Sequence, residues 1–463
     1  MRYVSTRGGV EPVGFAEAVM MGLGTDGGLL VPESIPQIGP ATLADWGRLR
    51  FQDLAVEVLT PYVAGELSRE ELEDLVNRSF ASFSHPEVTP LVRVGRHQVL
   101  ELFHGPTAAF KDVALQLLGN LFAHFLARDG GRLNILGATS GDTGSAAIAG
   151  VRGKPRIEIF ILFPYGRVSP IQERQMTTVL DANVHNLAIR GTFDDGQRIV
   201  KALFNDLPFR DAHHLGAVNS INWARILAQT IYYFYAWGRV SGGDPERRVS
   251  FSVPTGNFGD IFAGYLAKRM GLPVARLIIA TNRNDILSRF VHTGVYSAGE
   301  VHPTLSPSMD IQIASNFERY LYYLHGERPE AVRALLAEMS RSGEMRVGAG
   351  QQAMVAGDFD AAAASDEETL EQIRATHRET GYILDPHTAV GVHAAGGHKD
   401  VICLATAHPA KFNEAVRAAI GVEAPPPPAL RGLMEKATRS VLLDASEDAV
   451  REHICATLAT AEA

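Results

Sequence analysis

The stretch that decides the fold is residues 249–270, which read VSFSVPTGNFGDIFAGYLAKRM. It begins with Val249–Val253, which has the length and the apolar content of a buried strand. A glycine-rich turn follows and leads into an apolar helix, expected over Phe258–Met270. From about residue 95 onward the chain repeats this order of strand, loop and helix. Short apolar strands that alternate with amphipathic helices predict an α/β fold with parallel open sheets covered by helices.

The other predicted elements follow the same alternation. Strands are expected over Gln98–Phe103, Leu133–Gly137, Ile157–Phe163, Val184–Ile189, Leu277–Thr281 and Val401–Ala405. Helices are expected over Val113–Leu126, Thr143–Val151, Pro170–Val179, Gly196–Leu203, Trp223–Trp237 and Lys411–Ile420. Ligands of such sheets bind beyond the carboxyl ends of the strands, so the site is expected in the loops at those ends.

Segments outside this alternation have other characters. Up to about Val92 the chain has the pattern of a small, mostly helical N-terminal domain. Pro329–Arg341 and Glu367–Glu379 are typical of solvated helices added to a core. Ala361–Ala364 and Pro425–Pro428 are low in complexity, and the prolines suit a stiff connector to a helical tail.

The composition excludes several classes of protein. Of the 463 residues 46% are hydrophobic and 21% are charged, which is ordinary for a globular protein. Lys and Arg number 43 and Asp and Glu number 52, so the net charge of −9 disfavours nonspecific binding of nucleic acid. The two cysteines exclude a disulfide framework, and there is neither a signal-peptide core nor an apolar run of about 18 residues. These features predict a cytoplasmic enzyme without a nucleic-acid or membrane partner.

The first of four loops that follow predicted strands contains Lys111. It reads HGPTAAFKD at residues 104–112 and leads into the helix expected from Val113. The positive end of a helix dipole disfavours a cation in the first turn, and burial against Phe110 acts in the same direction. Both effects favour the neutral, nucleophilic form of the amine. A solvated lysine at a helix start is the alternative that this loop alone leaves open.

Two further loops have the composition of anion sites. In ATSGDTGS at residues 138–145, hydroxyls and the N–H groups of the following helix suit a carboxylate or a phosphate, and an ordinary helix cap is the alternative. In PTGNFGD at residues 254–260, Gly256 and Gly259 allow close backbone approach to a phosphate. This loop lacks both the lysine of nucleoside-triphosphate loops and the three-glycine dinucleotide pattern. A single phosphate is therefore expected there, or else a plain turn.

The fourth loop, ATAHPAKF at residues 405–412, places Thr406 at the end of a strand with its hydroxyl towards the crevice, although a threonine there is more often a cap. The histidines, among them His213, His214 and His387, lack zinc-type spacing, so no metal is predicted and structural or capping roles are expected. Together the four loops supply a lysine, a single-phosphate cradle, a carboxylate loop and a polar strand end. These are the parts that pyridoxal phosphate requires.

Longer segments of the chain resemble a known family. They include ELFHGPTAAFKDVALQ at residues 101–116, TSGDTGSA at 139–146, GRVSPIQERQMTT at 166–178 and AVNSINWARILAQ at 217–229. The sequence resembles the threonine synthase family, pyridoxal-phosphate enzymes of fold type II (the tryptophan-synthase-β type), and within it the long branch with an extra N-terminal domain. The matching segments run from residue 3 to residue 412 in the order of the family.

The resemblance implies the cofactor, pyridoxal 5'-phosphate, and the residues that hold it. Lys111 would form the internal Schiff base and then act as the catalytic base. Thr406 would hydrogen-bond the pyridine nitrogen; because it is neutral, we infer a moderated electron sink. The cofactor phosphate would be held by Gly256, Asn257, Phe258, Gly259 and Asp260.

The resemblance also points to residues for the substrate. Ser140 and Thr143 would lie near the substrate carboxylate. Shorter relatives have an asparagine at the position of Asp142, where it meets the phenolic oxygen of the cofactor. An ionised aspartate cannot donate that hydrogen bond, so the role of Asp142 stays open. The substrate phosphate needs a cation, for which Arg167, with Arg225 and Lys411 as further candidates, is proposed.

The implied reaction converts O-phospho-L-homoserine and water into L-threonine and phosphate by γ-elimination and β-hydration, the last step of threonine biosynthesis. The alternatives are a phosphohomoserine lyase or a threonine dehydratase on the same fold, or a noncatalytic phosphoester-binding protein. The implied organisation is an N-terminal domain over 1–94, a cofactor-binding α/β region over 95–424 whose smaller subdomain covers about 105–215, and a connector with a helical tail over 425–463. We expect a monomer and leave a dimer open.

Overall fold

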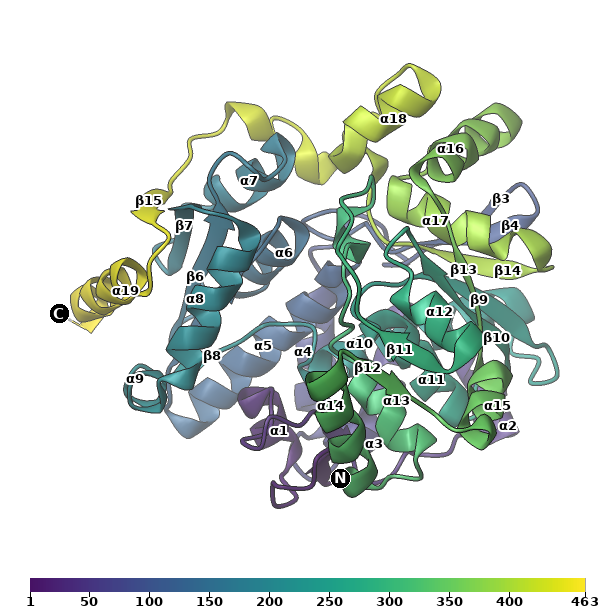
Figure 1. The fold of residues 1–463 in the computed structure, drawn as a ribbon, viewed down its shortest axis with the longest axis horizontal. Coiled ribbons are helices and arrows are strands. Elements are labelled where there is room, and N and C mark those ends of the chain that lie inside the picture. The colour runs from purple at the N-terminus through teal and green to yellow at the C-terminus, as the bar shows by residue number, and fades with distance from the viewer. Residues whose placement is uncertain (463) are drawn as a thin grey trace. The chain divides into compact units, whose positions relative to one another are not determined.

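The computed structural model describes residues 1–462 and divides the chain into two compact units (Figure 1). The first unit comprises Met1–Ala114 and Ser220–Pro427. The second comprises Leu115–Asn219 and Pro428–Ala463, of which residue 463 lies outside the described residues. The chain passes from one unit to the other within helix α5 (Lys111–Asp129). Each unit is defined by contacts between its residues and combines segments that are far apart in the sequence. The division therefore does not test the three-segment organisation inferred from the sequence, which stays a prediction.

The first unit holds most of the elements. Its strands are β1 (Tyr3–Ser5), β2 (Leu30–Pro32), β3 (Leu91–Val94), β4 (His97–Glu101), β9 (Val249–Pro254), β10 (Val274–Thr281), β11 (Val295–Ser297), β12 (Glu344–Arg346), β13 (Phe359–Ala363) and β14 (Val401–Ala405). Its α-helices, besides the start of α5, are α1 (Phe15–Met21), α2 (Pro40–Trp46), α3 (Phe51–Val63), α4 (Arg69–Phe80), α10 (Trp223–Ser241), α11 (Gly259–Arg269), α12 (Ile286–Thr293), α13 (Phe317–Leu324), α14 (Pro329–Ser342), α15 (Ala349–Asp358), α16 (Asp366–Thr380), α17 (Pro386–Ala394) and α18 (Asn413–Ile420). The 3₁₀ turns are η1 (Pro307–Met309), η2 (Ala395–Gly397) and η3 (Pro409–Phe412).

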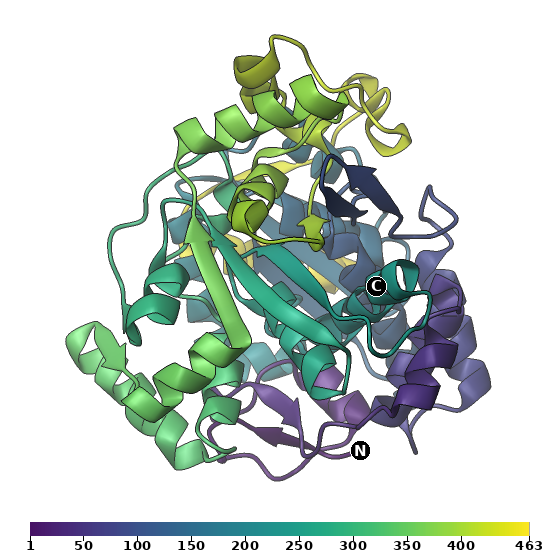
Figure 2. The same ribbon diagram turned by 90° about the vertical axis from the view of Figure 1, so that its right-hand side faces the viewer.

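A six-stranded sheet forms the centre of the first unit, in the order β13-β10-β9-β14-β4-β3. Every neighbouring pair is parallel except β3 and β4, which form an antiparallel pair at one edge. The predicted parallel arrangement is thus confirmed for β4, β9, β10 and β14. Most of the low-complexity stretch Ala361–Ala364 lies in β13, which the sequence did not predict as a strand and which pairs with β10 in register Ile279–Ala361. Figure 2 shows this edge strand in light green beside the teal strands.

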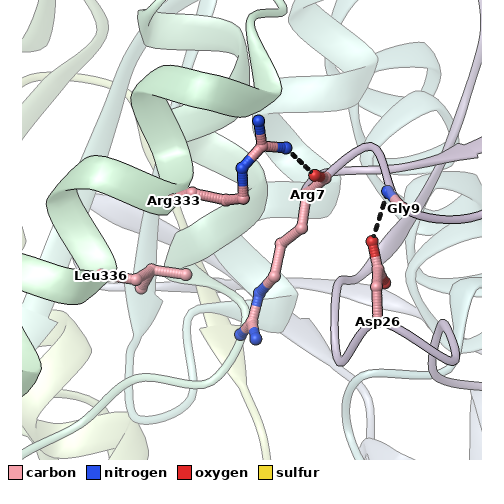
Figure 3. A pocket seen from close by; sticks show the side chains of 5 residues that line it. All are labelled: Arg7, Gly9, Asp26, Arg333 and Leu336. Atoms are coloured by element: carbon pink, nitrogen blue, oxygen red, sulfur yellow. Dashed lines mark hydrogen bonds between the residues drawn. The ribbon is translucent and has the colours of Figure 1, made fainter.

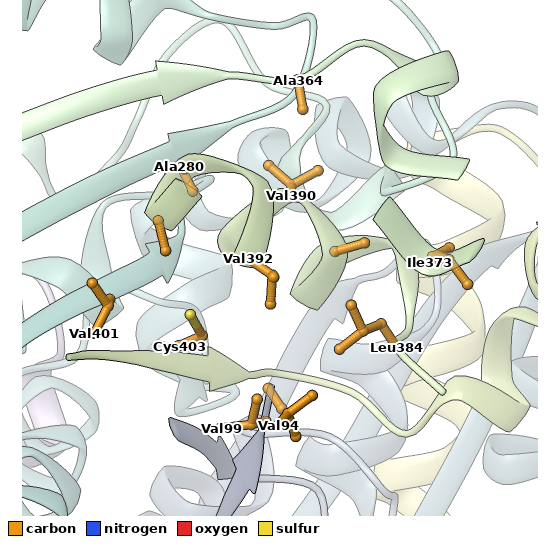
Figure 4. Packing of buried hydrophobic residues seen from close by; sticks show 14 of the residues in the cluster. Val94, Val99, Ala280, Ala364, Ile373, Leu384, Val390, Val392, Val401 and Cys403 are labelled. Carbon is orange, nitrogen blue, oxygen red and sulfur yellow. The ribbon is translucent and has the colours of Figure 1, made fainter. Parts of the chain in front are cut away.

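Helices cover both faces of this sheet. On one face Val390 and Val392 of α17 lie among side chains of the sheet such as Cys403 and Val99 (Figure 4). On the other face α10 and α11 pack closely, and a Cβ at Gly264 would be 3.0 Å from Leu277 Cδ2. Side chains alternate along a strand, so the apolar runs predicted as buried strands serve both faces at once.

The N-terminal part of the first unit is mostly helical, as predicted. Strands β1 and β2 form an antiparallel pair, and helices α1–α4 are the other regular elements of the first 80 residues, joined by loops. Helix α3 packs on α10, where the rings of Phe51 and Tyr235 meet at 5.3 Å. The buried Arg319 guanidinium donates to the Leu30 carbonyl oxygen at 3.0 and 3.1 Å, which fastens β2 to α13.

The second unit has its own parallel sheet, in the order β15-β7-β6-β5-β8. Its strands are β5 (Leu133–Ala138), β6 (Ile157–Pro164), β7 (Val184–Arg190), β8 (Leu215–Gly216) and β15 (Val441–Asp444). Its helices, besides the rest of α5, are α6 (Asp142–Val151), α7 (Pro170–Thr177), α8 (Phe193–Asn205), α9 (Leu207–Ala212) and α19 (Glu447–Glu462), with 3₁₀ turns η4 (Pro428–Leu430) and η5 (Leu433–Glu435). All the neighbouring strands pair in parallel, as predicted for β5, β6 and β7.

The core of the second unit lies between the sheet and two helices. Leu162 and Ile189 of the sheet pack with Ile199 of α8 and with Val450 and Ile454 of α19. Figure 1 shows β15 and α19, in yellow, at the β7 edge of this sheet. Within residues 1–462, no helix combines the length and the apolar character that crossing a bilayer requires.

Candidate functional site

Lys111 is the first residue of α5, and its side chain is buried. The amine nitrogen lies 4.9 Å from the centre of the Phe110 ring. Just before it the backbone turns through a left-handed conformation at Ala108, with φ of 55°. Lys111 is therefore not the solvated lysine that its loop alone left open. It is a buried amine at the positive end of a helix.

The loop that carries Lys111 is tied to the loop that follows β14. The Phe110 N–H donates to the Thr406 carbonyl oxygen at 2.8 Å, and the His408 N–H donates to the Ala108 carbonyl oxygen at 3.1 Å. The side chain of Thr406 is itself buried. These backbone bonds place two of the predicted cofactor residues, Lys111 and Thr406, on adjoining segments of the first unit.

The glycine-rich loop after β9 is built for close approach. A Cβ at Gly256 would be 2.7 Å from the Ser308 carbonyl oxygen, so the loop can pass that backbone only as glycine. Phe258 has a left-handed backbone, with φ of 64°, and precedes the first residue of α11. The Asn257 carbonyl oxygen accepts a hydrogen bond from the Asn316 N–H at 3.0 Å. The loop thus ends at the start of an 11-residue helix, whose first N–H groups suit a phosphate.

Asp260 follows Gly259 in the first turn of α11 and is buried. The hydroxyls of Tyr232 and Tyr233 donate to its Oδ1 at 2.6 and 2.9 Å. Within the described residues 1–462 its Oδ2 has no hydrogen-bond partner. Burial raises the pKa of Asp260 to about 6, and the tyrosine hydrogen bonds and the charge of Lys111 act against that rise. Lys111 and the glycine-rich loop belong to the same compact unit, and the charge of Lys111 acts on Asp260.

The predicted substrate loop lies in the second unit, between β5 and α6. Thr139 caps the turn, because its Oγ1 accepts hydrogen bonds from Gly141 N–H at 3.0 Å and Gly144 N–H at 2.9 Å. Ser140 is exposed and Thr143 is half-buried. The N-cap residue of α6 is Gly141, which has no side-chain cap, and Thr139, two residues earlier, accepts from the Gly144 N–H in the first turn instead.

Asp142 opens α6 with a buried side chain. Its Oδ1 accepts a hydrogen bond from Gln172 Nε2 at 2.7 Å. The amide of Gln172 is oriented in turn, since Ser169 Oγ lies 2.9 Å from its Oε1. An ionised carboxylate can only accept hydrogen bonds, so it suits a position where the amide N–H group of Gln172 donates to it. In the second unit Asp142 is thus anchored by an amide, a contact that the sequence did not predict.

The three cationic candidates lie in different surroundings. Arg167 is exposed in the loop between β6 and α7. Arg225 is buried in the first turn of α10, and burial lowers its pKa to about 10. Lys411 is buried in η3, where its Nζ donates to the Thr107 carbonyl oxygen at 2.9 Å. Lys411 therefore braces the loop that carries Lys111.

Sequence analysis missed three side chains that hold predicted site residues. Tyr232 and Tyr233 lie in a helix predicted to be apolar. A buried tyrosine hydroxyl there requires a hydrogen-bond partner, but the sequence does not show which residue that partner is. Gln172 had no signal at all, because its partner Asp142 is 30 residues away in the chain. His387, for which a structural or capping role was expected, lies in the first turn of α17, where the Asp385 carboxylate accepts hydrogen bonds from the backbone N–H groups of His387 and Thr388.

The residues of the first unit fit pyridoxal phosphate. An aldehyde needs a buried amine, which Lys111 offers. A phosphate needs free N–H groups at a helix start, which the first turn of α11 after the glycine-rich loop offers. The pyridine ring needs a polar group at its nitrogen, for which Thr406 is available. One compact unit carries all of these donors.

Three family models match the chain. The threonine synthase N-terminal model matches residues 2–80, the model of pyridoxal-phosphate-dependent enzymes matches 83–341, and the threonine synthase C-terminal model matches 388–454. The threonine synthase of Pseudomonas aeruginosa is 51% identical over 451 residues, which cover 96% of each chain. The chain belongs to the threonine synthase family. The threonine synthase of Schizosaccharomyces pombe is 49% identical over 90% of this chain and 89% of its own.

Two solved threonine synthases share the architecture. The structure from Brucella melitensis, with pyridoxal phosphate bound, has a TM-score of 0.96 at 48% identity and covers 99% of both chains. The yeast structure has a TM-score of 0.94 at 46% identity, again over 99% of both. The predicted fold type II, the cofactor pyridoxal 5'-phosphate and the lyase class are confirmed by this membership. The relatives do not favour a phosphohomoserine lyase, a threonine dehydratase or a noncatalytic binding protein.

This threonine synthase family member also has a pocket of about 350 Å³ beside its N-terminal strands (Figure 3). It is lined by Arg7, Gly9, Asp26, Arg333 and Leu336. The charges in it are already engaged: Arg7 pairs with Glu318 at 2.8 Å, Arg333 donates to the Arg7 carbonyl oxygen, and Asp26 accepts from the Gly9 N–H at 2.7 Å. None of the lining residues was a predicted site residue.

Proposed function

We propose that this member of the threonine synthase family converts O-phospho-L-homoserine and water into L-threonine and phosphate, with Lys111 as the catalytic residue. The observation that carries the proposal is the grouping of a buried lysine, a glycine-rich loop at a helix start and a buried strand-end threonine in one unit. Identity of 51% with a threonine synthase over 96% of the chain supports the same assignment.

We assign the cofactor contacts to residues of the first unit. The N–H groups of the loop Gly256–Asp260 and of the first turn of α11 hold the phosphate, and Thr406 Oγ1 meets the pyridine nitrogen. Lys111 Nζ holds the aldehyde carbon. When bound, pyridoxal phosphate supplies an electron sink that stabilises negative charge at the α-carbon of an amino acid joined to it.

In the proposed reaction one side chain of the protein, Lys111, carries the proton that is transferred. The ε-amine of Lys111, in its neutral form, takes the α-proton from the substrate. Its burial against Phe110 keeps water from the amine and limits the number of positions it can adopt. In the net reaction the bond between the γ-carbon and the phosphate oxygen breaks, and a bond from water oxygen to the β-carbon forms. The β-carbon and the water each give up one proton, the γ-carbon and the leaving phosphate each take one up, and the α-proton returns to the α-carbon.

For the substrate we propose residues of the second unit. Ser140 and Thr143 flank the start of α6, whose N–H groups suit the α-carboxylate. Asp142, anchored by Gln172, stabilises this loop from its buried side. Arg167 is our choice for the substrate phosphate, because an exposed guanidinium can bind and release a phosphate in bidentate fashion. Lys411 is committed to the Thr107 carbonyl oxygen and is less suited to this role.

The test is a product analysis. The purified protein is given O-phospho-L-homoserine, and phosphate, threonine and 2-oxobutyrate are measured together. We expect phosphate and threonine in equal amounts. Lys111→Ala should abolish the visible absorbance of the bound cofactor and lower turnover at least about 10³-fold, since it removes the general base. The exposed Lys399→Ala serves as the matched control and should change neither.

Two outcomes would contradict the proposal. Phosphate released with 2-oxobutyrate and without threonine would identify a lyase, and full activity in Lys111→Ala would remove the catalytic assignment. We further propose that the enzyme works in the cytoplasm as a monomer, on the support of its low cysteine content and its diffuse net charge of −9. Light scattering on the same preparation measures the mass, and a dimeric mass would overturn that part.

A further inference from the structure

His387 has a hydrogen-bond partner for each of its two ring nitrogens. It is buried in the first turn of α17, next to the capping residue Asp385. Its Nδ1 lies 2.9 Å from Asp385 Oδ1, and its Nε2 accepts a hydrogen bond from the Ser308 N–H at 3.2 Å. The Phe412 ring packs edge-on against the imidazole at 4.8 Å.

These two partners fix the state of the ring. A neutral imidazole has one N–H donor and one acceptor nitrogen. A backbone N–H can only donate, so Nε2 of His387 must be the acceptor towards Ser308. The carboxylate of Asp385 accepts, so the proton sits on Nδ1. Both ring nitrogens are therefore satisfied, as burial requires of polar atoms.

Ser308 connects the imidazole to the glycine-rich loop. It lies in η1, a single 3₁₀ turn, and its carbonyl oxygen is the atom that a Cβ at Gly256 would approach to 2.7 Å. The N–H of Ser308 thus binds His387 while its carbonyl side forms the wall along Gly256. Any shift of η1 would either press on the loop or let it relax.

We propose that His387 is a positioning residue for the cofactor phosphate. It holds η1 in place through Ser308 and so sets the backbone of the Gly256–Asp260 loop, while Asp385 keeps its proton on Nδ1. The inference rests on the proposed function, since it assigns to that loop the phosphate of pyridoxal phosphate. His387 itself touches neither cofactor nor substrate in this scheme.

Two substitutions separate the two hydrogen bonds of the ring. In His387→Gln the amide oxygen can take the place of Nε2 and accept from Ser308, while the bond to Asp385 is lost. In His387→Asn the amide can take the place of Nδ1 and donate to Asp385, but it is too short to reach Ser308. His393→Asn, on the same helix and half-buried, controls for the loss of a histidine from α17.

The experiment titrates the full-length chain, freed of its cofactor, with pyridoxal 5'-phosphate and separately with pyridoxal, and follows the visible absorbance. For His387→Asn we expect the dissociation constant of pyridoxal phosphate to rise at least about tenfold, because the loop loses a buried hydrogen-bonded support. The constant for pyridoxal, which has no phosphate, should stay within about twofold. His387→Gln should recover most of the affinity, and His393→Asn should match the wild type.

The contrary results are distinct. Equal weakening of pyridoxal and pyridoxal phosphate in His387→Asn, or equal weakening by the Asn and Gln variants, would reduce His387 to a packing residue. Unchanged affinity in His387→Asn would overturn the inference as well. Failure of the proposed function would instead appear in the wild-type chain, which would bind neither compound at Lys111.

Discussion

Asp112, next to Lys111, is a carboxyl group that the fold keeps out of water. It is fully buried, and it accepts hydrogen bonds from Thr107 N–H at 2.8 Å and from Thr107 Oγ1 at 2.6 Å. Burial raises its pKa to about 6, although the hydrogen bonds from Thr107 and the charge of Lys411 oppose the rise. A Cβ at Gly105 would be 2.4 Å from Asp112 Cβ, so a glycine is required there. The carboxyl group therefore shapes the turn that presents Lys111.

The raised pKa of Asp112 predicts a pH dependence. Because the folded state holds this proton up to about pH 6 and the unfolded state only up to about 3.8, the wild type loses stability as pH rises between these values. Asp112→Asn can keep both contacts to Thr107 and has no proton to lose. Between pH 4 and pH 7 the wild type should lose roughly 1–3 kcal/mol relative to this variant. Urea unfolding at several pH values measures the difference, and parallel pH profiles of the two proteins would refute the assignment.

Among the elements, helices α5 and α6 of the second unit cross at two glycines. A Cβ at Gly119 would be 2.0 Å from the Gly150 carbonyl oxygen, and a Cβ at Gly150 would be 2.4 Å from the Leu115 carbonyl oxygen. Both contacts are to backbone atoms, which cannot move away from an added methyl group as the end of a flexible side chain can. The crossing therefore depends on the absence of side chains, and it sets the distance between α5 and the helix that Asp142 begins.

Substitutions at two helical glycines should have opposite effects. Gly150→Ala should destabilise the second unit by about 1–3 kcal/mol, because the two helices must separate to admit the methyl group. Gly357→Ala, in the exposed last turn of α15 with open space around it, should instead stabilise by up to about 1 kcal/mol through helix propensity. Thermal unfolding of both variants tests this pair. A Gly150→Ala protein as stable as the wild type would show that the crossing has slack.

At the scale of the whole molecule, the end of the chain returns to complete the second unit. Strand β15 pairs in parallel with β7, in register Leu443–Ile189. Helix α19 then covers α8, with Val450 and Ile454 fully buried. The sequence predicted a helical tail after the proline run. It did not predict β15. This strand has only four residues, which do not alternate between apolar and polar and are mostly exposed, so the hydrophobic pattern does not identify a strand there.

Removal of this segment should therefore damage the second unit. A chain that ends at residue 427 uncovers the edge of β7 and the apolar side chains of α8, and each of the two buried residues of α19 alone contributes about 1.5–3 kcal/mol. We expect aggregation or strong binding of a hydrophobic dye. A chain that ends at Ala459 keeps both residues and should behave as the full-length protein. If the shorter chain remained soluble and dye-free, the segment would be an accessory to the fold.

The sequence by itself determined the alternation of strands and helices, the parallel sheets and the loops in which we propose the site. These features are local: apolar strands, helical periodicity, and glycines and hydroxyls at strand ends can be recognised within about ten residues. The buried state of Lys111 was expected from its neighbour Phe110, which is local as well.

Only the tertiary structure decided which side chains hold those loops. The pairing of Tyr232 with Asp260, of Gln172 with Asp142 and of His387 with Ser308 joins residues that are 28, 30 and 79 positions apart in the chain. Residues 359–363 form strand β13 because they pair with the edge of β10. The alanines in this stretch do not by themselves favour a strand. Hydrogen-bond partners and sheet neighbours are set by the packing of distant elements, which leaves no periodic trace in the sequence.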